Sequence, residues 1–279
     1  MHDTTTVWRG FTRPQLDAAY NNAASIPDAM ARLAAWGERS AKFRAAHPKL
    51  LDLAYGPRPR NRLDLFRCGA EDSSLFVFIH GGYWQSREKE LFSHMAAGPN
   101  ALGMDVAMIG YTLAPDISLT GIVAETHEAL RWLRREGPRH GVGRGRLVVS
   151  GWSAGGHLTA TAMPRPEVDA GLAISGIFDV EPCRHNYLNE KLKLTAEEAA
   201  AMSPLLHLPE KKKPLVVAYG TRELPELQRQ SVDYWKAWSD AGGPGELLPL
   251  DHHHISILDE FNSAEGELAQ AARRLANQT

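Results

Sequence analysis

The sequence predicts an α/β protein whose sheet is mostly parallel and is covered by helices on both faces. Two observations carry this prediction. Short apolar runs alternate with longer amphipathic segments along most of the 279 residues, and strands that alternate with helices form parallel, doubly wound sheets. One apolar run, 147–152, also leads into a glycine-rich turn and then into a helix-compatible segment. The length suits one domain over 1–279.

The expected elements follow in a regular order. Two helices are expected within residues 11–46, broken near 25–28, and an antiparallel hairpin over 50–66. Another helix is expected around Leu91 to Met95. The remaining strands are expected at 74–79, 106–111, 147–152, 170–176, 214–220 and 246–250, with further helices at 119–135, 228–241 and 257–276.

Residues 180–211 do not fit this alternation. The segment lies between two expected strands, carries a helical patch at 196–202 and ends in a proline-rich stretch. Long insertions within compact domains commonly serve binding sites. We therefore expect 180–211 to be a small cap over one edge of the sheet, either as a mobile lid or as a fixed wall.

Charge and cysteine content argue against several classes of protein. The net charge is −2, and Lys211–Lys213 is the only basic cluster, so nucleic acid is not an expected partner. Cys68 and Cys183 form neither a disulfide framework nor a metal-type spacing, and they suggest reduced thiols. Residues 1–6 lack the features of a signal peptide, and no apolar stretch reaches the ~20 residues that span a bilayer. We expect a cytoplasmic protein that does not engage a membrane.

The turn Gly151-Trp152-Ser153-Ala154-Gly155 matches the G-x-S-x-G pattern of a nucleophile elbow. The pattern is loose alone, but an apolar strand precedes it here and helix-compatible residues follow. Two glycines would let strand and helix approach closely enough to hold the serine in a strained conformation. We expect Ser153 to be a nucleophile at the carboxyl end of the sheet. An ordinary glycine-rich turn is the alternative.

A nucleophilic serine needs a base that takes its proton and an acid that orients the base. After such an elbow the partners follow in the order acid, then histidine. Glu223 comes just after the strand at 214–220 and is the expected acid, with Glu226 as the alternative.

The histidine should follow the last strand, where the sequence reads Asp251-His252-His253-His254. We expect His254 to be the base because it directly precedes the apolar residues that anchor the closing helix. Adjacent histidines without i, i+4 spacing or thiol partners are poor zinc ligands, so no metal is expected.

Backbone N–H groups must stabilise the oxyanion of the tetrahedral intermediate. The loop His80-Gly81-Gly82-Tyr83-Trp84 directly follows a buried strand, and its glycines can turn amides inward. Gly82 and Tyr83 are the expected donors there, and Ala154 is the expected donor after the nucleophile.

Several aromatic residues could border a site for an aryl substrate. Trp84 and Trp152 are the expected substrate contacts, with Tyr83, Tyr111 and Tyr187 as further candidates. Core packing is the alternative for each. No arginine stands out in the sequence as a carboxylate clamp.

Taken together, His80–Trp84, Gly151–His157, the segment around Glu223 and His254-Ile255-x-Ile257 resemble the α/β-hydrolase-fold kynurenine formamidases (arylformamidases) and their esterase relatives. The resemblance covers most of the chain. It implies a serine hydrolase of tryptophan catabolism that needs no metal or cofactor and cleaves N-formylkynurenine or a similar aryl formamide. A carboxylesterase for short acyl esters is the nearest alternative.

Two positions depart from the wider family pattern. Tyr83 stands where many esterases carry a third glycine, which fits the formamidase-like form, and Glu223 stands where aspartate is frequent. A ligand-binding protein that has lost catalysis is a further alternative, because fold does not fix function. The expected partner is a small-molecule substrate, and an exposed edge strand near the hairpin would permit a homodimer.

Overall fold

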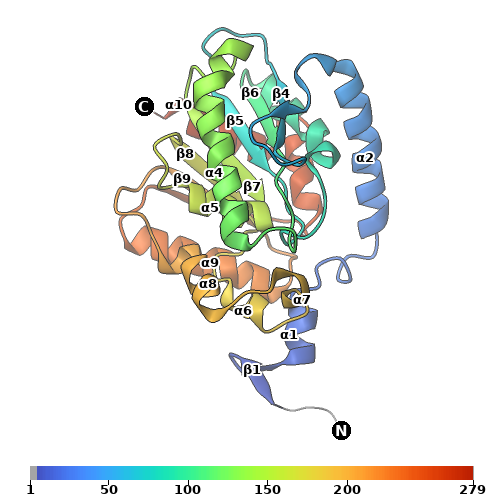
Figure 1. The fold of residues 1–279 in the computed structure, drawn as a ribbon, viewed down its shortest axis with the longest axis vertical. Coiled ribbons are helices and arrows are strands. Elements are labelled where there is room, and N and C mark those ends of the chain that lie inside the picture. Colours follow the sequence, from blue (N-terminus) through green and yellow to red (C-terminus); the bar gives the residue numbers. More distant parts are fainter. Residues whose placement is uncertain (1–4, 279) are drawn as a thin grey trace.

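The computed structural model describes residues 5–278. Residues 1–4, which belong to the segment considered above for a signal peptide, and residue 279 lie outside the described residues. The described chain folds around an eight-stranded sheet in the order β10-β9-β8-β7-β5-β6-β4-β3 (Figure 1). These strands are β3 (Leu53–Ala54), β4 (Arg62–Phe66), β5 (Leu75–Ile79), β6 (Asp105–Ile109), β7 (Leu147–Trp152), β8 (Ala170–Ile174), β9 (Leu215–Gly220) and β10 (Gly245–Leu250).

The strands from β10 to β6 pair in parallel, and β4 and β3 extend the sheet antiparallel at one edge. The central strand β5 shows why both faces are covered. Leu75, Val77 and Ile79 belong to one buried cluster, whereas Phe76 and Phe78 belong to the other. A strand that is apolar on both sides needs helices on both sides.

Helices cover the two faces in two sets. The first set packs with the cluster that holds Val77, and the second packs with the cluster that holds Phe76. The first set comprises α1 (Arg13–Ala19), α4 (Leu119–Glu136), α5 (Ala154–Ala162) and α9 (Pro225–Asp240). The second comprises α2 (Ala29–Ala46), the 3₁₀ helix η2 (Lys89–Ala96), α3 (Ala97–Ala101), the 3₁₀ helix η5 (Ser256–Phe261) and α10 (Glu267–Asn277). Short 3₁₀ turns η1 (Pro48–Leu50) and η3 (Gly137–His140) complete the connections. The predicted mostly parallel, doubly covered sheet is confirmed.

Three local features differ from the sequence-based expectation. A small hairpin of β1 (Thr6–Trp8) and β2 (Phe11–Thr12) precedes α1, and its turn has φ of 40° at Arg9 and 84° at Gly10. The segment expected as a helix near Leu91 begins as the 3₁₀ helix η2. The expected closing helix is divided into η5 and α10, because the chain turns tightly where a Cβ on Gly266 would lie 2.0 Å from the Glu260 carbonyl oxygen.

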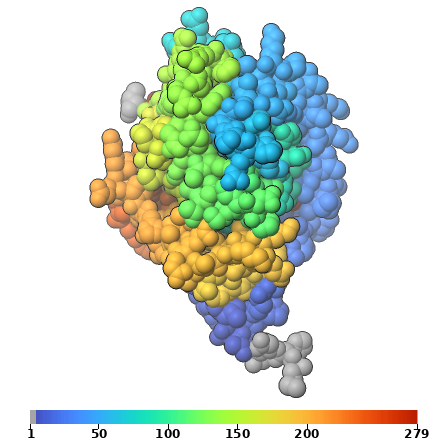
Figure 2. Space-filling model, viewed as in Figure 1, coloured from blue at the N-terminus to red at the C-terminus, as the bar shows by residue number. Residues whose placement is uncertain are grey.

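The insertion at 180–211 contains α6 (Glu181–Arg184), α7 (Asn189–Leu192), α8 (Ala196–Ala201) and the 3₁₀ turn η4 (Pro204–Leu206). It lies with α1 and α9 at one end of the sheet (Figure 1), and Figure 2 shows it as the yellow and orange layer above the blue N-terminal segment. The amide of Tyr187 donates to Asp17 of α1 at 2.7 Å. The side-chain amide of Gln85 donates to the Leu188 carbonyl at 2.8 Å. The insertion is thus bonded both to α1 and to the loop after β5.

Among residues 5–278, no helix combines the length and apolar character needed to cross a membrane.

Candidate active site

Ser153 occupies the sharp turn between β7 and α5, with φ 59° and ψ −118°. Residues other than glycine rarely adopt positive φ, and such strain often marks a functional site. The turn also needs its two glycines. A Cβ on Gly151 would lie 2.3 Å from the carbonyl oxygen of Gly155, and a Cβ on Gly155 would lie 1.9 Å from that of Ile79. The local structure is therefore that of a nucleophile elbow.

Ser153 lines a small cavity of about 130 Å³. Segments that are far apart in the sequence meet around it and contribute, among others, Asn22, Tyr83, Arg87, Trp152, Tyr187 and His254. Within residues 5–278 the Ser153 hydroxyl has no hydrogen-bond partner. The hydroxyl and the His254 side chain therefore share one cavity, as a nucleophile and its base must.

The Glu223 carboxylate lies beside the His254 ring. One oxygen, Oε1, accepts hydrogen bonds from the Ser175 hydroxyl and from the Gly220 amide. The other, Oε2, lies 3.6 Å from His254 Nδ1. Both Oε2 and Nδ1 are buried and have no hydrogen-bond partner in the described chain. The arrangement holds the carboxylate in place through one oxygen and leaves the other for the histidine.

Glu226, the alternative acid, points to a different partner. Its carboxylate pairs with Arg229 at 2.9 Å and accepts from the Tyr20 hydroxyl at 3.4 Å. The structure thus brings Glu223, and not Glu226, to His254.

Trp152 positions the histidine from the other side. Its indole N–H donates to the His254 carbonyl at 2.8 Å, and the two ring centroids are 4.8 Å apart. Trp152 also lines the cavity, as expected of a substrate contact. It is only 2% exposed, so its main contacts are with the protein.

The two neighbouring histidines do not reach the cavity. His252 Nε2 lies 2.8 Å from a carboxylate oxygen of Glu260, and His253 Nδ1 accepts from the backbone amide of Ser256 at 3.1 Å. Within the described range, no group of three or more His, Cys, Asp or Glu side chains could hold a metal ion.

The loop after β5 lies against the elbow. A Cβ on Gly81 would lie 2.7 Å from the Trp152 ring and 3.0 Å from Cβ of Ser153. The next residues have positive φ, 117° at Gly82 and 50° at Tyr83. No acceptor in the described part of the chain is bonded to the amides of Gly82, Tyr83 or Ala154. These three expected oxyanion donors are therefore free to bind a ligand.

Tyr83 links this loop to the N-terminal segment. Its hydroxyl donates to the Tyr20 carbonyl at 2.7 Å and accepts from the Asn22 side chain at 2.8 Å. Tyr187 of the insertion also donates to the Tyr20 carbonyl, at 3.2 Å. Burial raises the pKa of the Tyr83 phenol, which therefore remains a neutral donor. The chain just after α1 thus becomes part of the cavity wall.

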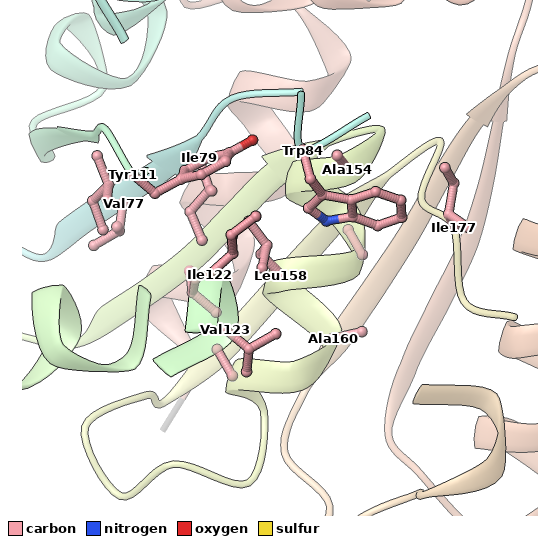
Figure 3. Close-up of a cluster of buried hydrophobic side chains, with 14 of the residues drawn as sticks. Val77, Ile79, Trp84, Tyr111, Ile122, Val123, Ala154, Leu158, Ala160 and Ile177 are labelled. Atoms are coloured by element: carbon pink, nitrogen blue, oxygen red, sulfur yellow. The ribbon is translucent and has the colours of Figure 1, made fainter. Parts of the chain in front are cut away.

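Trp84 does not fulfil the expectation of a substrate contact. It does not line the cavity, its backbone has φ of 59°, and its side chain is fully buried. Figure 3 shows Trp84 packed in the core near Ala154, Leu158 and Ile177. Its ring lies 5.0 Å from that of His157 in an edge-to-face arrangement.

Tyr111 is also a core residue (Figure 3). Its hydroxyl donates to the His80 carbonyl at 2.9 Å, and it is fully buried. Core packing, the alternative stated for these aromatic residues, therefore describes both Trp84 and Tyr111.

Three residues of the site escaped the sequence analysis. Ser175, which donates a hydrogen bond to Glu223, directly follows β8, the strand beside β7. Its place at the carboxyl end of a strand next to the elbow could have indicated a role in the site. Asn22 lines the cavity from the chain just after α1. Arg87 lines the cavity from the middle of a loop, and nothing in its sequence context indicates this.

The fold and the site together define a hydrolase of the α/β-hydrolase fold. Comparison with known proteins agrees: a family model for the alpha/beta hydrolase fold matches residues 76–213. Kynurenine formamidases of Danio rerio and Salmo salar are 26% and 28% identical to this chain, and each alignment covers 92% of both proteins. The crystal structure of a candidate thioesterase from Silicibacter sp. TM1040 superposes with a TM-score of 0.84 at 29% identity, over 92% of this chain and 98% of that one. The chain thus has the α/β-hydrolase fold and is similar to kynurenine formamidases and to esterases of that fold.

Proposed function

We propose that this chain is a serine hydrolase that removes the formyl group from an aryl formamide, with N-formylkynurenine as the favoured substrate. The observation that carries the chemistry is the shared cavity of Ser153 and His254, with the buried Glu223 carboxylate 3.6 Å from His254. The relatives named above support the choice of substrate, because kynurenine formamidases match the chain over nearly its whole length.

In the proposed reaction, His254 takes the proton of Ser153 as its hydroxyl attacks the formyl carbon. Glu223 holds the imidazole tautomer and stabilises the imidazolium. The histidine then gives the proton to the departing aryl amine. Water, activated by the same histidine, hydrolyses the formyl-enzyme and releases formate.

The free amides of Gly82, Tyr83 and Ala154 have the role of the oxyanion hole. They donate to no acceptor in residues 5–278, so binding the oxyanion disrupts no existing hydrogen bond. Donors that are fixed in advance stabilise the transition state without reorganisation, and each is worth about 10²–10³ in kcat. The loop and the elbow together hold them in place.

The 3.6 Å separation between Glu223 and His254 is compatible with this mechanism. Catalytic hydrogen bonds are often long in ligand-free enzymes and shorten in the substrate complex. No other described group bonds to either atom, so nothing must be displaced for them to meet.

The cavity supports a small acyl group. Its volume of about 130 Å³ is well below the range of about 300–1,000 Å³ that is usual for drug-sized ligands. The Trp152, Tyr83 and Tyr187 side chains line it and suit an aromatic amine. We propose that the insertion at 180–211, which contributes Tyr187, forms a fixed wall of the single domain, because it is bonded to α1 and to the loop after β5.

A carboxylesterase for short acyl esters is the second candidate. The same residues catalyse ester cleavage by the same steps, and the structural relative from Silicibacter sp. is a candidate thioesterase. The catalytic groups are the same for an amide and for an ester, so only measurements with the two kinds of substrate distinguish the two activities.

Steady-state hydrolysis of N-formyl-L-kynurenine and of p-nitrophenyl acetate separates the two candidates, with Ser153→Ala as the control. A formamidase gives a much higher kcat/KM for the formamide, and the variant abolishes it. Good ester turnover with negligible formamide cleavage would assign the chain to the esterases instead.

A further inference from the structure

Arg87 lines the same cavity as Ser153, yet no residue of the described chain balances its charge. Its side chain makes no hydrogen bond or ion pair within residues 5–278, and its Nε is buried without a partner. The guanidinium carbon lies over the Trp152 ring, 5.8 Å from the ring centroid. A half-buried cation without a counter-ion is unfavourable unless a ligand supplies the charge.

The backbone at Arg87 is fixed in a strained conformation. Its φ is 73°, which is uncommon for a residue with a side chain. The Arg60 guanidinium donates to the Arg87 carbonyl at 2.6 Å and to the Tyr111 carbonyl at 2.8 Å. Strain of this kind persists only where the surroundings impose it, and it is concentrated at functional sites. The loop therefore holds Arg87 at the cavity at some energetic cost.

The acidic side chains around this loop do not pair with Arg87, and the adjacent Glu88 is exposed and forms no ion pair with it within residues 5–278. Lys89, two residues along, binds Asp52, Asp64 and Glu90 at 2.6–2.9 Å. Burial lowers the pKa of Arg87, but a guanidinium remains protonated in proteins at neutral pH. The cavity thus presents one uncompensated positive charge.

We infer that Arg87 is a specificity-determining residue that binds a carboxylate group of the substrate. A guanidinium matches a carboxylate through two parallel hydrogen bonds, and the Trp152 ring supports its plane from one side. The inference rests on the proposed function for the reacting bond but adds a separate requirement, namely a negative charge on the substrate. Neutral aryl formamides and neutral esters are then the poorer substrates.

The test compares substrates that differ only in this charge. N-formyl-L-kynurenine and its methyl ester carry the same formamide, and the ratio of their kcat/KM values measures the preference for the carboxylate. Arg87→Met should lower this ratio by about 10- to 100-fold, the effect expected for hydrogen bonds to a charged group. Arg87→Lys keeps the charge but loses the two parallel hydrogen bonds of a guanidinium, so its ratio should fall between those of the wild type and Arg87→Met. Arg135→Met, which removes an exposed charge on α4, should keep the wild-type ratio.

A binding experiment separates this inference from the proposed reaction. In the Ser153→Ala variant, calorimetry should show benzoate binding more tightly than benzamide, and adding Arg87→Met should remove the difference. This result would support the carboxylate site even if the wild-type enzyme cleaved no formamide. An unchanged substrate ratio in both Arg87 variants, or equal binding of benzoate and benzamide at low salt, would overturn the inference while leaving Ser153 catalysis intact.

Discussion

The carboxylate of Glu223 and the imidazole of His254 face each other across 3.6 Å, and neither facing atom has another partner in residues 5–278. Ser175 and Gly220 hold the second carboxylate oxygen. Isolated buried polar atoms are unfavourable, so the two atoms are expected to form a hydrogen bond with each other when the imidazole becomes charged. The relationship makes Glu223 the acid on which the proposed catalysis depends.

Glu223→Gln should lower kcat/KM by about 10³- to 10⁴-fold, because the amide favours the wrong imidazole tautomer and carries no charge. Steady-state kinetics on the best substrate measures this. Glu226→Gln is the matched control. It weakens the ion pair with Arg229, so it should lower the free energy of unfolding and leave kcat/KM nearly unchanged. A larger loss of rate in Glu226→Gln than in Glu223→Gln would contradict the assignment.

Gly82→Ala should lower kcat by about 10²- to 10³-fold, the effect of losing one oxyanion donor. The added Cβ would lie 2.3 Å from the Ser86 carbonyl oxygen at a residue with φ of 117°, so the amides of the loop must move. Gly37→Ala is the control, since its Cβ would be 3.9 Å from the nearest atom in the interior of α2. It should keep full activity and raise stability by about 0.5–1 kcal/mol. Full activity in Gly82→Ala would argue against this loop as the oxyanion hole.

The two tryptophans should respond differently to replacement by phenylalanine. Trp152→Phe removes the hydrogen bond to the His254 carbonyl and should lower kcat/KM by about 3- to 10-fold. Trp84→Phe leaves a void in the core and should lower the free energy of unfolding by about 1–3 kcal/mol with little change in KM. Kinetics and denaturant unfolding on both variants check this. A raised KM without loss of stability in Trp84→Phe would restore Trp84 as a substrate contact.

His157, on α5, makes the protein sensitive to acid. Burial lowers its pKa from 6.5 to about 4, and its Nε2 lies 2.7 Å from the Met202 carbonyl oxygen, so the neutral ring donates there. As the pH falls below 6.5, the unfolded chain binds a proton that the folded chain refuses. Stability is therefore lost between about pH 6.5 and 4, by up to about 1.4 kcal/mol per pH unit for this group.

His157→Gln keeps a hydrogen-bond donor but does not titrate, so its stability should fall less steeply over the same pH window. Denaturant unfolding at pH 7.5 and 5 measures the difference. The buried His80 and His94 act with the same sign, since burial lowers their pKa values to about 3, so some acid sensitivity should remain. An equal slope in the variant and the wild type would rule out the contribution of His157.

Sequence patterns predicted the sheet, and they predicted that Ser153, Glu223 and His254 lie near one another, because both depend on local features: apolar runs, glycines and strand ends. They could not show that Trp152 lines the cavity while Trp84 packs in the core, because the direction of each side chain is set by the folded backbone. Arg87 was missed for the same reason, since its φ of 73° and its bond from Arg60 arise only in the folded loop. Side-chain direction in loops is a property of tertiary structure.

The most direct test of the central claim is covalent labelling of Ser153 by a fluorophosphonate, followed by mass spectrometry of the peptides. The account predicts one phosphonyl group on Ser153, loss of hydrolysis in proportion to labelling, and no labelling in Ser153→Ala. Much slower labelling is expected in Glu223→Gln. Undiminished hydrolysis in Ser153→Ala, or a folded wild-type protein that the probe leaves unlabelled at Ser153, would contradict the claim that this chain is a serine hydrolase.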